Sequence, residues 1–142
     1  MNPYQVVIDT NVIVSALRSR RGSSYKLLML IGSEKFEINL SVPLMLEYEK
    51  TAKKLIGKID LLGKDIDGIL DYLASVANRR QVFYLWRPFL KDPKDDMVLE
   101  LAVAGNCDFI VTYNKIDFQG VESFGVRTLT PKEFLQKIGE LP

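Results

Sequence analysis

Apolar residues in this chain fall into short continuous runs that alternate with longer stretches of helical spacing. The continuous runs, rich in β-branched and aromatic residues, predict five strands, at residues 6–8, 36–40, 81–85, 108–112 and 126–129. Apolar residues three and four positions apart predict helices at residues 12–17, 23–31, 43–55, 65–78, 94–105 and from 130 onward. Strands alternating with helices predict an α/β fold with a central, mainly parallel sheet of about five strands.

Turn-forming residues mark the ends of several of these helices. Ser23 or Ser24 is expected to cap the second helix, and Gly32 to end it. Polar residues followed by proline favour a helix start at residues 41–43, 92–93 and 130–131. Residues 57–63 are expected to form a break, and residues 86–91 a connecting loop. Because no repeat, low-complexity tract or linker interrupts the pattern, we expect one domain over residues 1–142.

Asp9 stands where the first predicted strand should end. Its three preceding residues are apolar and β-branched, as in a strand buried on both faces of a parallel sheet. In open α/β sheets, ligands bind beyond the carboxyl ends of the strands. Asp is also a common helix cap, because its carboxylate accepts hydrogen bonds from free N–H groups at a helix start. Asp9 is therefore either a site residue or a cap.

Composition narrows the chemistry that such a site could perform. The 142 residues include one cysteine and no histidine, and the formal net charge is +1. Without histidine, Ser-His-Asp triads, histidine acid–base catalysis and most zinc sites are excluded. A bound metal would need oxygen ligands, which favours Mg²⁺, Mn²⁺ or Ca²⁺. No apolar run approaches the ~20 residues of a membrane span, so we expect a cytoplasmic protein without a membrane partner.

Four further polar positions are expected at the same edge of the sheet as Asp9. Glu47 lies early in the helix after the second strand, and Asp95 heads an apolar stripe in the helix after the third. Asp96, one position around that helix, is the second choice. Asn114 and Asp117 follow the fourth strand. With parallel strands and right-handed crossovers, these positions share one edge of the sheet.

Each acid also has a structural explanation when it is considered alone. Asp92 has the position of a helix cap, and Asp95 completes a pattern resembling a capping box. Asp117 can be a turn residue, and Glu47 a solvated helix residue. The joint pattern favours a site, because several carboxylates at one edge repel each other unless a cation lies among them.

Four stretches in this order resemble the PIN domain family, in particular the VapC-like toxins of bacterial and archaeal toxin–antitoxin systems. They are residues 7–12 (VIDTNV), 41–48 (SVPLMLEY), 92–102 (DPKDDMVLELA) and 111–118 (VTYNKIDF). The resemblance covers nearly the whole chain. It implies a three-layer α/β/α sandwich and a metal-dependent endoribonuclease that acts on single-stranded or structured RNA.

The resemblance also implies roles for particular residues. The acidic quartet would be Asp9, Glu47, Asp95 and Asp117. One or two Mg²⁺ or Mn²⁺ ions would be held by Asp9, Asp95 and Asp117, with Asp96 as the alternative to Asp95. Supporting residues would be Thr10, Asn11, Ser15, Thr112 and Asn114. Many relatives have Asp where this chain has Asn114, which leaves Asp117 as the fourth charge. Basic residues available for RNA are Arg18, Arg20, Arg21, Lys91, Lys94 and Lys115.

A metal-activated water would attack phosphorus and leave products with a 5′-phosphate and a 3′-hydroxyl. The expected partners are the RNA substrate, a cognate antitoxin and a second copy in a homodimer. An antitoxin would present a basic residue or an amphipathic segment to the acidic groove.

Two other classes remain open at this point. The first is a catalytically inactive PIN-like module that binds RNA or protein. The second is a phosphotransfer domain with Asp at a strand end, which the sequence disfavours. The dehalogenase type requires a second Asp at the position where this chain has Asn11. The receiver type has an acidic pair before its phosphorylated Asp, and no acid precedes Asp9.

Overall fold

A five-stranded, wholly parallel sheet forms the centre of the fold in the computed structural model, which describes residues 2–82 and 89–142. The strand order is β3-β2-β1-β4-β5. The strands are β1 (Tyr4–Ile8), β2 (Phe36–Leu40), β3 (Asn78–Arg79), β4 (Phe109–Val111) and β5 (Arg127–Leu129). The predicted α/β class with a parallel sheet of about five strands is confirmed.

Six α-helices and two short 3₁₀ helices connect and follow the strands. The α-helices are α1 (Thr10–Arg18), α2 (Ser23–Leu30), α3 (Val42–Lys53), α4 (Gly63–Val76), α5 (Pro93–Ala104) and α6 (Pro131–Lys137). The 3₁₀ helices are η1 (Lys115–Phe118) and η2 (Val121–Phe124), both between β4 and β5. Caps define several starts: Ser41, Asp92 and Thr130 each accept a backbone N–H, and proline follows within two residues.

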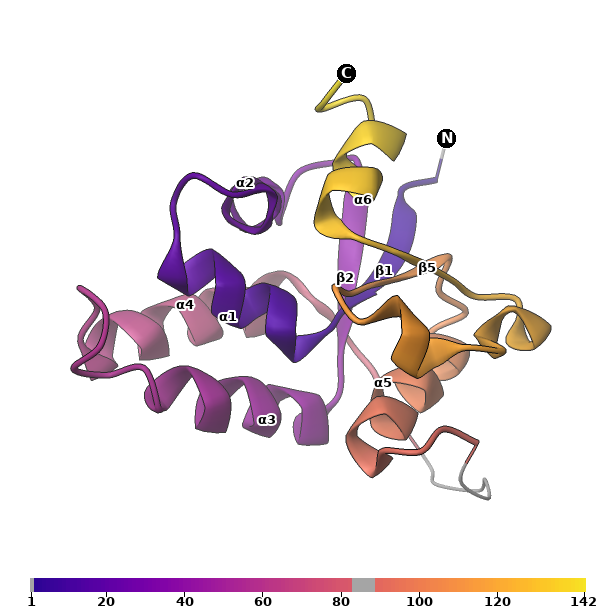
Figure 1. The fold of residues 1–142 in the computed structure, drawn as a ribbon, viewed down its shortest axis with the longest axis horizontal. Helices are drawn as coiled ribbons and strands as arrows, with labels where there is room; N and C mark the ends of the chain where they lie inside the picture. The colour runs from indigo at the N-terminus through magenta and orange to yellow at the C-terminus, as the bar shows by residue number, and fades with distance from the viewer. Residues whose placement is uncertain (1, 83–88) are drawn as a thin grey trace.

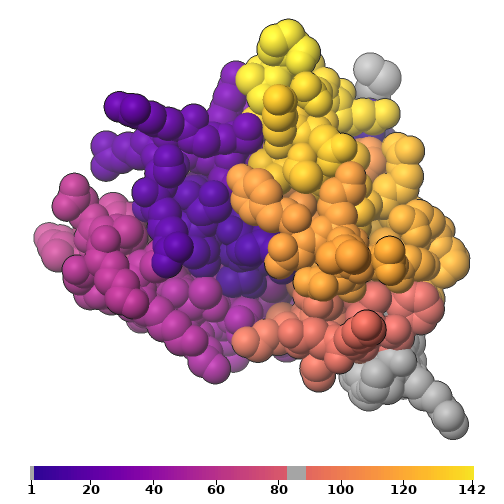
Figure 2. All heavy atoms as spheres, in the orientation of Figure 1, coloured from indigo at the N-terminus to yellow at the C-terminus, as the bar shows by residue number. Residues whose placement is uncertain are grey.

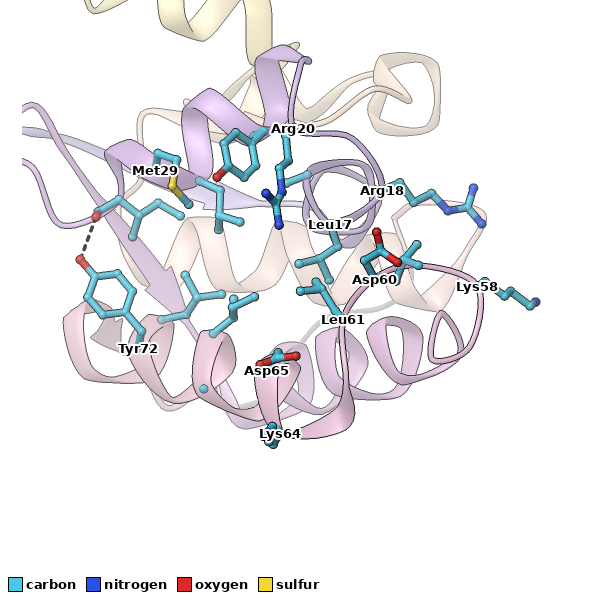
Figure 3. A pocket seen from close by; sticks show the side chains of 18 of the residues that line it. Leu17, Arg18, Arg20, Met29, Lys58, Asp60, Leu61, Lys64, Asp65 and Tyr72 are labelled. Carbon is cyan, nitrogen blue, oxygen red and sulfur yellow. Dashed lines mark hydrogen bonds between the residues drawn. The ribbon is translucent and has the colours of Figure 1, made fainter.

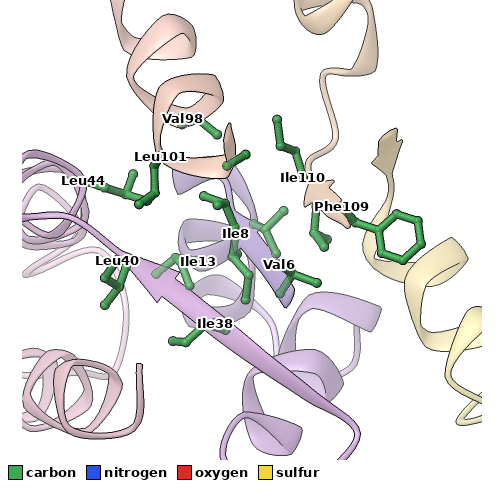
Figure 4. Close-up of a cluster of buried hydrophobic side chains, with 14 of the residues drawn as sticks. Val6, Ile8, Ile13, Ile38, Leu40, Leu44, Val98, Leu101, Phe109 and Ile110 are labelled. Atoms are coloured by element: carbon green, nitrogen blue, oxygen red, sulfur yellow. The ribbon is translucent and has the colours of Figure 1, made fainter. Parts of the chain in front are cut away.

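Helices cover both faces of the sheet. Figure 1 shows α1, α3 and α4 on one side of β1 and β2, and α5 on the other. Helix α1 packs against α2 and α3, whereas α5 packs against β1, β2 and β4. In Figure 4, Val6 and Ile8 of β1 lie between Ile13 of α1 and Val98 of α5. Because β1 is covered on both faces, its residues are apolar without alternation, as the sequence pattern indicated.

The strand order creates a crevice beside the end of β1. From β1 the chain moves outward to β2 and β3, and it later returns to β4 on the opposite side of β1. The connections that leave β1 and β4 therefore diverge, and such a point is where α/β sheets bind ligands. Asp9 follows β1 there and Thr112 follows β4. Figure 1 shows α1 starting after the end of β1 and α3 starting after the end of β2.

The third strand lies earlier in the chain than residues 81–85, where the sequence pattern placed it. Helix α4 ends at Val76, and β3 consists of Asn78 and Arg79, which pair with Asn39 and Leu40 of β2. Gln81 and Val82 are not in a strand, and residues 83–85 lie outside the described residues, as do residues 86–88 of the predicted loop at 86–91. Within the described residues, the segment that pairs with β2 therefore begins three residues before the predicted strand.

The predicted cap of α2 is also wrong. Gly22 precedes the helix, and neither Ser23 nor Ser24 caps it with its side chain. Ser24 is instead buried, with its hydroxyl hydrogen-bonded to the phenol oxygen of Tyr113. Within the described ranges, no helix is both long and apolar enough to cross a bilayer.

Candidate active site

A small cavity of about 160 Å³ lies at the carboxyl edge of the sheet, at the divergence between β1 and β4. Its lining combines the residues after two strands with the first turns of two helices. The lining residues are Asp9, Thr10, Asn11, Glu47, Asp92, Lys94, Asp95, Met97, Val98, Asn114 and Asp117. Figure 2 shows the start of α5 meeting the segment after β4 on the face that is turned to the viewer. The four acids of the expected quartet, Asp9, Glu47, Asp95 and Asp117, all line this cavity.

Asp9 is the most constrained of the four acids. Its side chain is buried, and its Oδ1 accepts the backbone N–H of Thr10 at 2.9 Å. Its Oδ2 accepts the hydroxyl of Thr112 at 2.8 Å and the amide of Asn11 at 3.3 Å. Burial raises the pKa of Asp9, the bonds from Thr112 and Thr10 lower it, and the charges of Asp117 and Glu47 raise it further. Asp9 is therefore both the cap of α1 and a cavity residue, so the two explanations of this residue do not compete.

Thr112 and Asn11 tie the ends of β1 and β4 together. The Thr112 hydroxyl accepts the backbone N–H of Asn114 at 3.0 Å while it donates to Asp9. Asn11 donates to the same hydroxyl at 3.4 Å and accepts the backbone N–H of Tyr113 at 3.4 Å. This network fixes the rotamer of Asp9 and aligns Asn114 at the cavity wall.

Glu47 reaches the cavity from the opposite side, from the second turn of α3. Its Oε1 accepts the Thr51 hydroxyl, one helical turn later, at 3.2 Å. The same oxygen lies 3.5 Å from Nζ of Lys94, which comes from the first turn of α5. The Glu47 side chain is only 18% exposed, whereas that of Lys94 is 64% exposed. Lys94 is the one basic residue among the described residues that line the cavity.

Asp95 is held among like charges. Burial, the largest cause, and the charges of Asp9, Asp92, Asp117 and Asp96, in that order, together raise its pKa to about 6. It is half-buried and lies in the first turn of α5, two residues after Pro93. Asp117, in η1, is exposed and lines the same cavity.

Asp96 is separate from this group. Because Asp95 heads the apolar stripe of this helix, the sequence predicts that Asp95 points inward, but the structure shows that Asp96 is the buried one. Its Oδ1 accepts the backbone N–H groups of Phe89 at 3.2 Å and Leu90 at 2.8 Å, and it does not line the cavity. Asp96 thus anchors the segment before α5, and the geometry favours Asp95 as the ligand.

Most of the basic residues expected to bind RNA are not beside the acids. Arg18 ends the nine-residue helix α1, about 13 Å along the axis from Asp9, and Arg20 and Arg21 follow it. Lys115, two residues before Asp117, pairs with Glu133 at 2.9 Å. Lys91 and Ser15 do not line the cavity.

Two contributors to the site were missed by the sequence reasoning. Tyr48 is fully buried, and its hydroxyl donates to the carbonyl of Ile8, directly before Asp9. Tyr48 lies within the helical apolar spacing of residues 43–55, and spacing alone does not distinguish a tyrosine that only packs in the core from one that also holds a strand end in place. Asp92 was predicted only as a cap. Its Oδ1 accepts the backbone N–H of Lys94 at 2.9 Å and so caps α5, and Asp92 also lines the cavity.

The donors in this cavity fit a hard divalent cation. Within residues 2–82 and 89–142, no three acidic or sulfur-containing side chains are positioned to hold a metal ion together. The donor atoms are nevertheless carboxylate and amide oxygens, the ligands that Mg²⁺ and Mn²⁺ prefer. Burial and, after it, the charges of neighbouring acids raise the pKa of both Asp9 and Asp95, and a cation among these acids would offset their repulsion.

A second, larger hollow lies away from the acids, between helices α1 and α2 on one side and α4 on the other. Its volume is about 1190 Å³, and its floor includes Leu17, Leu28 and Leu73. In Figure 3, Leu17 and Leu61 lie close together and Arg20 points into the hollow, whereas Arg18 and Lys58 extend away from it. The hollow therefore combines apolar side chains with charged ones, and Arg20 points into it. The charged lining residues are Arg18, Arg20, Lys58, Asp60, Lys64 and Asp65.

Comparisons with known proteins agree with this geometry. A family model described as PIN domain matches residues 5–116. A comparison with curated proteins gives no significant match. Among solved structures, the chain is similar to one described as VapBC2 from Rickettsia felis bound to a DNA fragment from their promoter. The TM-score is 0.57 and the identity 18%, over 87% of this chain and 98% of that one, which is a likeness of fold.

Proposed function

This chain belongs to the PIN domain family, and from that membership we propose that it is a metal-dependent endoribonuclease, the toxin component of a toxin–antitoxin pair. The observation that carries the proposal is the convergence of Asp9, Glu47, Asp95 and Asp117, from four separate segments, on one cavity without histidine. Acids that repel one another cost stability, so a fold that keeps them together implies a cation and a polyanionic substrate.

Each residue in the cavity has a distinct task in this proposal. Asp9, Asp95 and Asp117, with Glu47 beside them, would hold one or two Mg²⁺ or Mn²⁺ ions. Such ions, when bound, supply Lewis-acid activation of water and of the scissile phosphate. Thr112 keeps both oxygens of the Asp9 carboxylate aligned through its 2.8 Å hydrogen bond to Oδ2, opposite the Thr10 N–H on Oδ1.

The substrate would be single-stranded or structured RNA, which an acidic cavity binds only with help from cations. We limit the proposed phosphate contacts to Lys94, in the cavity wall, and Lys115, beside Asp117. Arg18 ends α1, Arg20 and Arg21 follow it, and none of the three lines the acid cavity. Attack by water on phosphorus would leave a 5′-phosphate and a 3′-hydroxyl, and such an enzyme would act in the cytoplasm, where RNA is accessible.

Cleavage of a 5′-labelled single-stranded RNA tests this proposal. We expect cleavage with Mg²⁺ or Mn²⁺ that is lost with EDTA and in Asp9→Asn, but kept in Glu122→Gln, an exposed acid outside the cavity. Products should carry a 5′-phosphate. Cleavage that survives in Asp9→Asn would contradict the site. No cleavage of several RNAs, together with unchanged melting temperature on metal addition, would favour the inactive PIN-like binding module instead.

We further propose that the antitoxin inserts an amphipathic segment into the larger hollow. The apolar floor accepts one face of such a segment, and the inward Arg20 favours a carboxylate on it. The similar structure is described as VapBC2, a name for an assembly rather than for one chain. A homodimer, implied by the family resemblance, stays a prediction.

Co-expression with the product of the adjacent gene tests this docking. Met29 lines the hollow and Leu46 does not, and both side chains are 58% exposed, so neither substitution should unfold the chain. We expect Met29→Glu to weaken inhibition of RNA cleavage by the partner at least tenfold and Leu46→Glu to leave it unchanged. Equal inhibition of both variants would contradict docking in this hollow.

A further inference from the structure

The ion pair between Lys94 and Glu47 spans the acid cavity from one helix to another. Lys94 belongs to the first turn of α5 and Glu47 to α3, and the ammonium lies 3.5 Å from Glu47 Oε1. Both residues line the cavity. Among the described residues that line the cavity, Lys94 therefore supplies the one ammonium, against the five carboxylates of Asp9, Glu47, Asp92, Asp95 and Asp117.

The two partners differ in freedom of movement. The Glu47 carboxylate is largely buried and is oriented by the hydroxyl of Thr51 at 3.2 Å, so its position does not depend on Lys94. The Lys94 backbone N–H is held by the Asp92 cap, but the Lys94 side chain is 64% exposed and has a flexible four-carbon chain. Lys94 can therefore leave Glu47 without rearrangement of either helix.

We propose that Lys94 is an internal counter-ion that competes with the divalent cation for Glu47. In the protein without metal, the ammonium neutralises part of the carboxylate cluster. A metal ion bound to Glu47 would lie close to this ammonium, and the repulsion between the two cations makes them compete for the carboxylate. This inference rests on the proposed function, since it assumes that the cluster binds a metal.

The competition predicts tighter metal binding when the ammonium is removed. An exposed ion pair is weak and screened by water, so we expect the Kd for Mn²⁺ to fall about three- to tenfold in Lys94→Met. Lys94→Arg, which keeps the charge, should bind Mn²⁺ with a Kd close to that of the wild type. In a Glu47→Gln background, Lys94→Met should change the Kd less than it does in the wild type.

Isothermal titration calorimetry with MnCl₂ on the folded chain, without RNA, measures these values. Lys91→Met is the matched control, because Lys91 is an exposed lysine just before the same helix and does not line the cavity. An unchanged or larger Kd in Lys94→Met, or a decrease no greater than in Lys91→Met, would overturn the competition. If neither the wild type nor Lys94→Met binds Mn²⁺, both this inference and the metal-dependent function fail. If the wild type binds Mn²⁺ and cleaves RNA but Lys94→Met has the same Kd, only the inference fails.

Discussion

Replacing Asp95 with Asn should stabilise the metal-free protein at neutral pH. The pKa of Asp95 rises from 3.8 to about 6 through burial and the charges of Asp9, Asp92, Asp117 and Asp96. A raised acid pKa means that the folded state disfavours the carboxylate. The penalty is complete above the folded pKa of about 6, decreases as the pH falls from 6 toward 3.8, and is absent below 3.8.

The size of the effect follows from three contributions. A difference of about 2 pKa units, at about 1.4 kcal/mol each, corresponds to about 3 kcal/mol. Because Asp95 is only half-buried, solvent screening reduces this to about 1.5 kcal/mol. Asn also loses the favourable interaction of a carboxylate with the start of α5, about 0.5 kcal/mol. The net expected gain is about 1 kcal/mol, or about 3 to 4 °C in melting temperature for a chain of this length.

Urea unfolding with EDTA at pH 7.5 and 4.5 measures this gain. The electrostatic part should fall to about a third at pH 4.5, and Glu122→Gln, an exposed control, should stay within about 0.5 kcal/mol of the wild type. Addition of Mn²⁺ should make the wild type more stable than Asp95→Asn, because a ligand at 100 times its Kd stabilises the wild type by about 2.7 kcal/mol. A variant that is less stable than the wild type in EDTA, or whose gain is the same at both pH values, would refute this reasoning.

Three further substitutions test the framework around the cavity by urea unfolding. Thr112→Val removes both the donor to Asp9 and an acceptor of a backbone N–H, so it should lower the free energy of unfolding by about 1 to 2 kcal/mol and raise the pKa of Asp9. An unchanged free energy of unfolding would show that water replaces the hydroxyl. Tyr48→Phe leaves the Ile8 carbonyl without its phenol donor and should cost about 1 to 2 kcal/mol with an unchanged m-value. Asp92→Ala should cost about 1 kcal/mol by removing the α5 cap, whereas Asp92→Asn should keep most of the stability, and equal losses in both would contradict the capping role.

Hydrophobic pattern and turn residues predicted most of the fold. Strand β2 lies at the predicted residues 36–40, and the strands at β4 and β5 differ from prediction only at their ends. The third strand was misplaced because its pairing depends on polar side chains. Asn78 donates to Gln5 and Glu37, and the Nε of Arg80 donates to Asn39, so hydrogen bonds across β1, β2 and β3 decide the register. Apolar periodicity contains no signal for such bonds.

The candidate cavity was expected from the order of acids along the chain. A parallel sheet places the residues after its strands at one edge, so the positions of Asp9, Glu47 and Asp117 followed from topology alone. Sequence could not exclude Arg18 from the same site, because the direction in which α1 leaves the sheet depends on its packing against α2 and α3.

The order of elements, the absence of histidine and the acids at the strand ends were determined by the sequence itself. Only the tertiary structure showed that Asp95, and not Asp96, lines the cavity. Helix α5 is buried around much of its circumference, with Val98, Leu99, Leu101 and Ala102 all inaccessible, so no single apolar face identifies its inward side. The backbone N–H groups of Phe89 and Leu90 bind Asp96, and Asp95 is thereby left to face the cavity. That choice depends on contacts between segments, which local periodicity cannot contain.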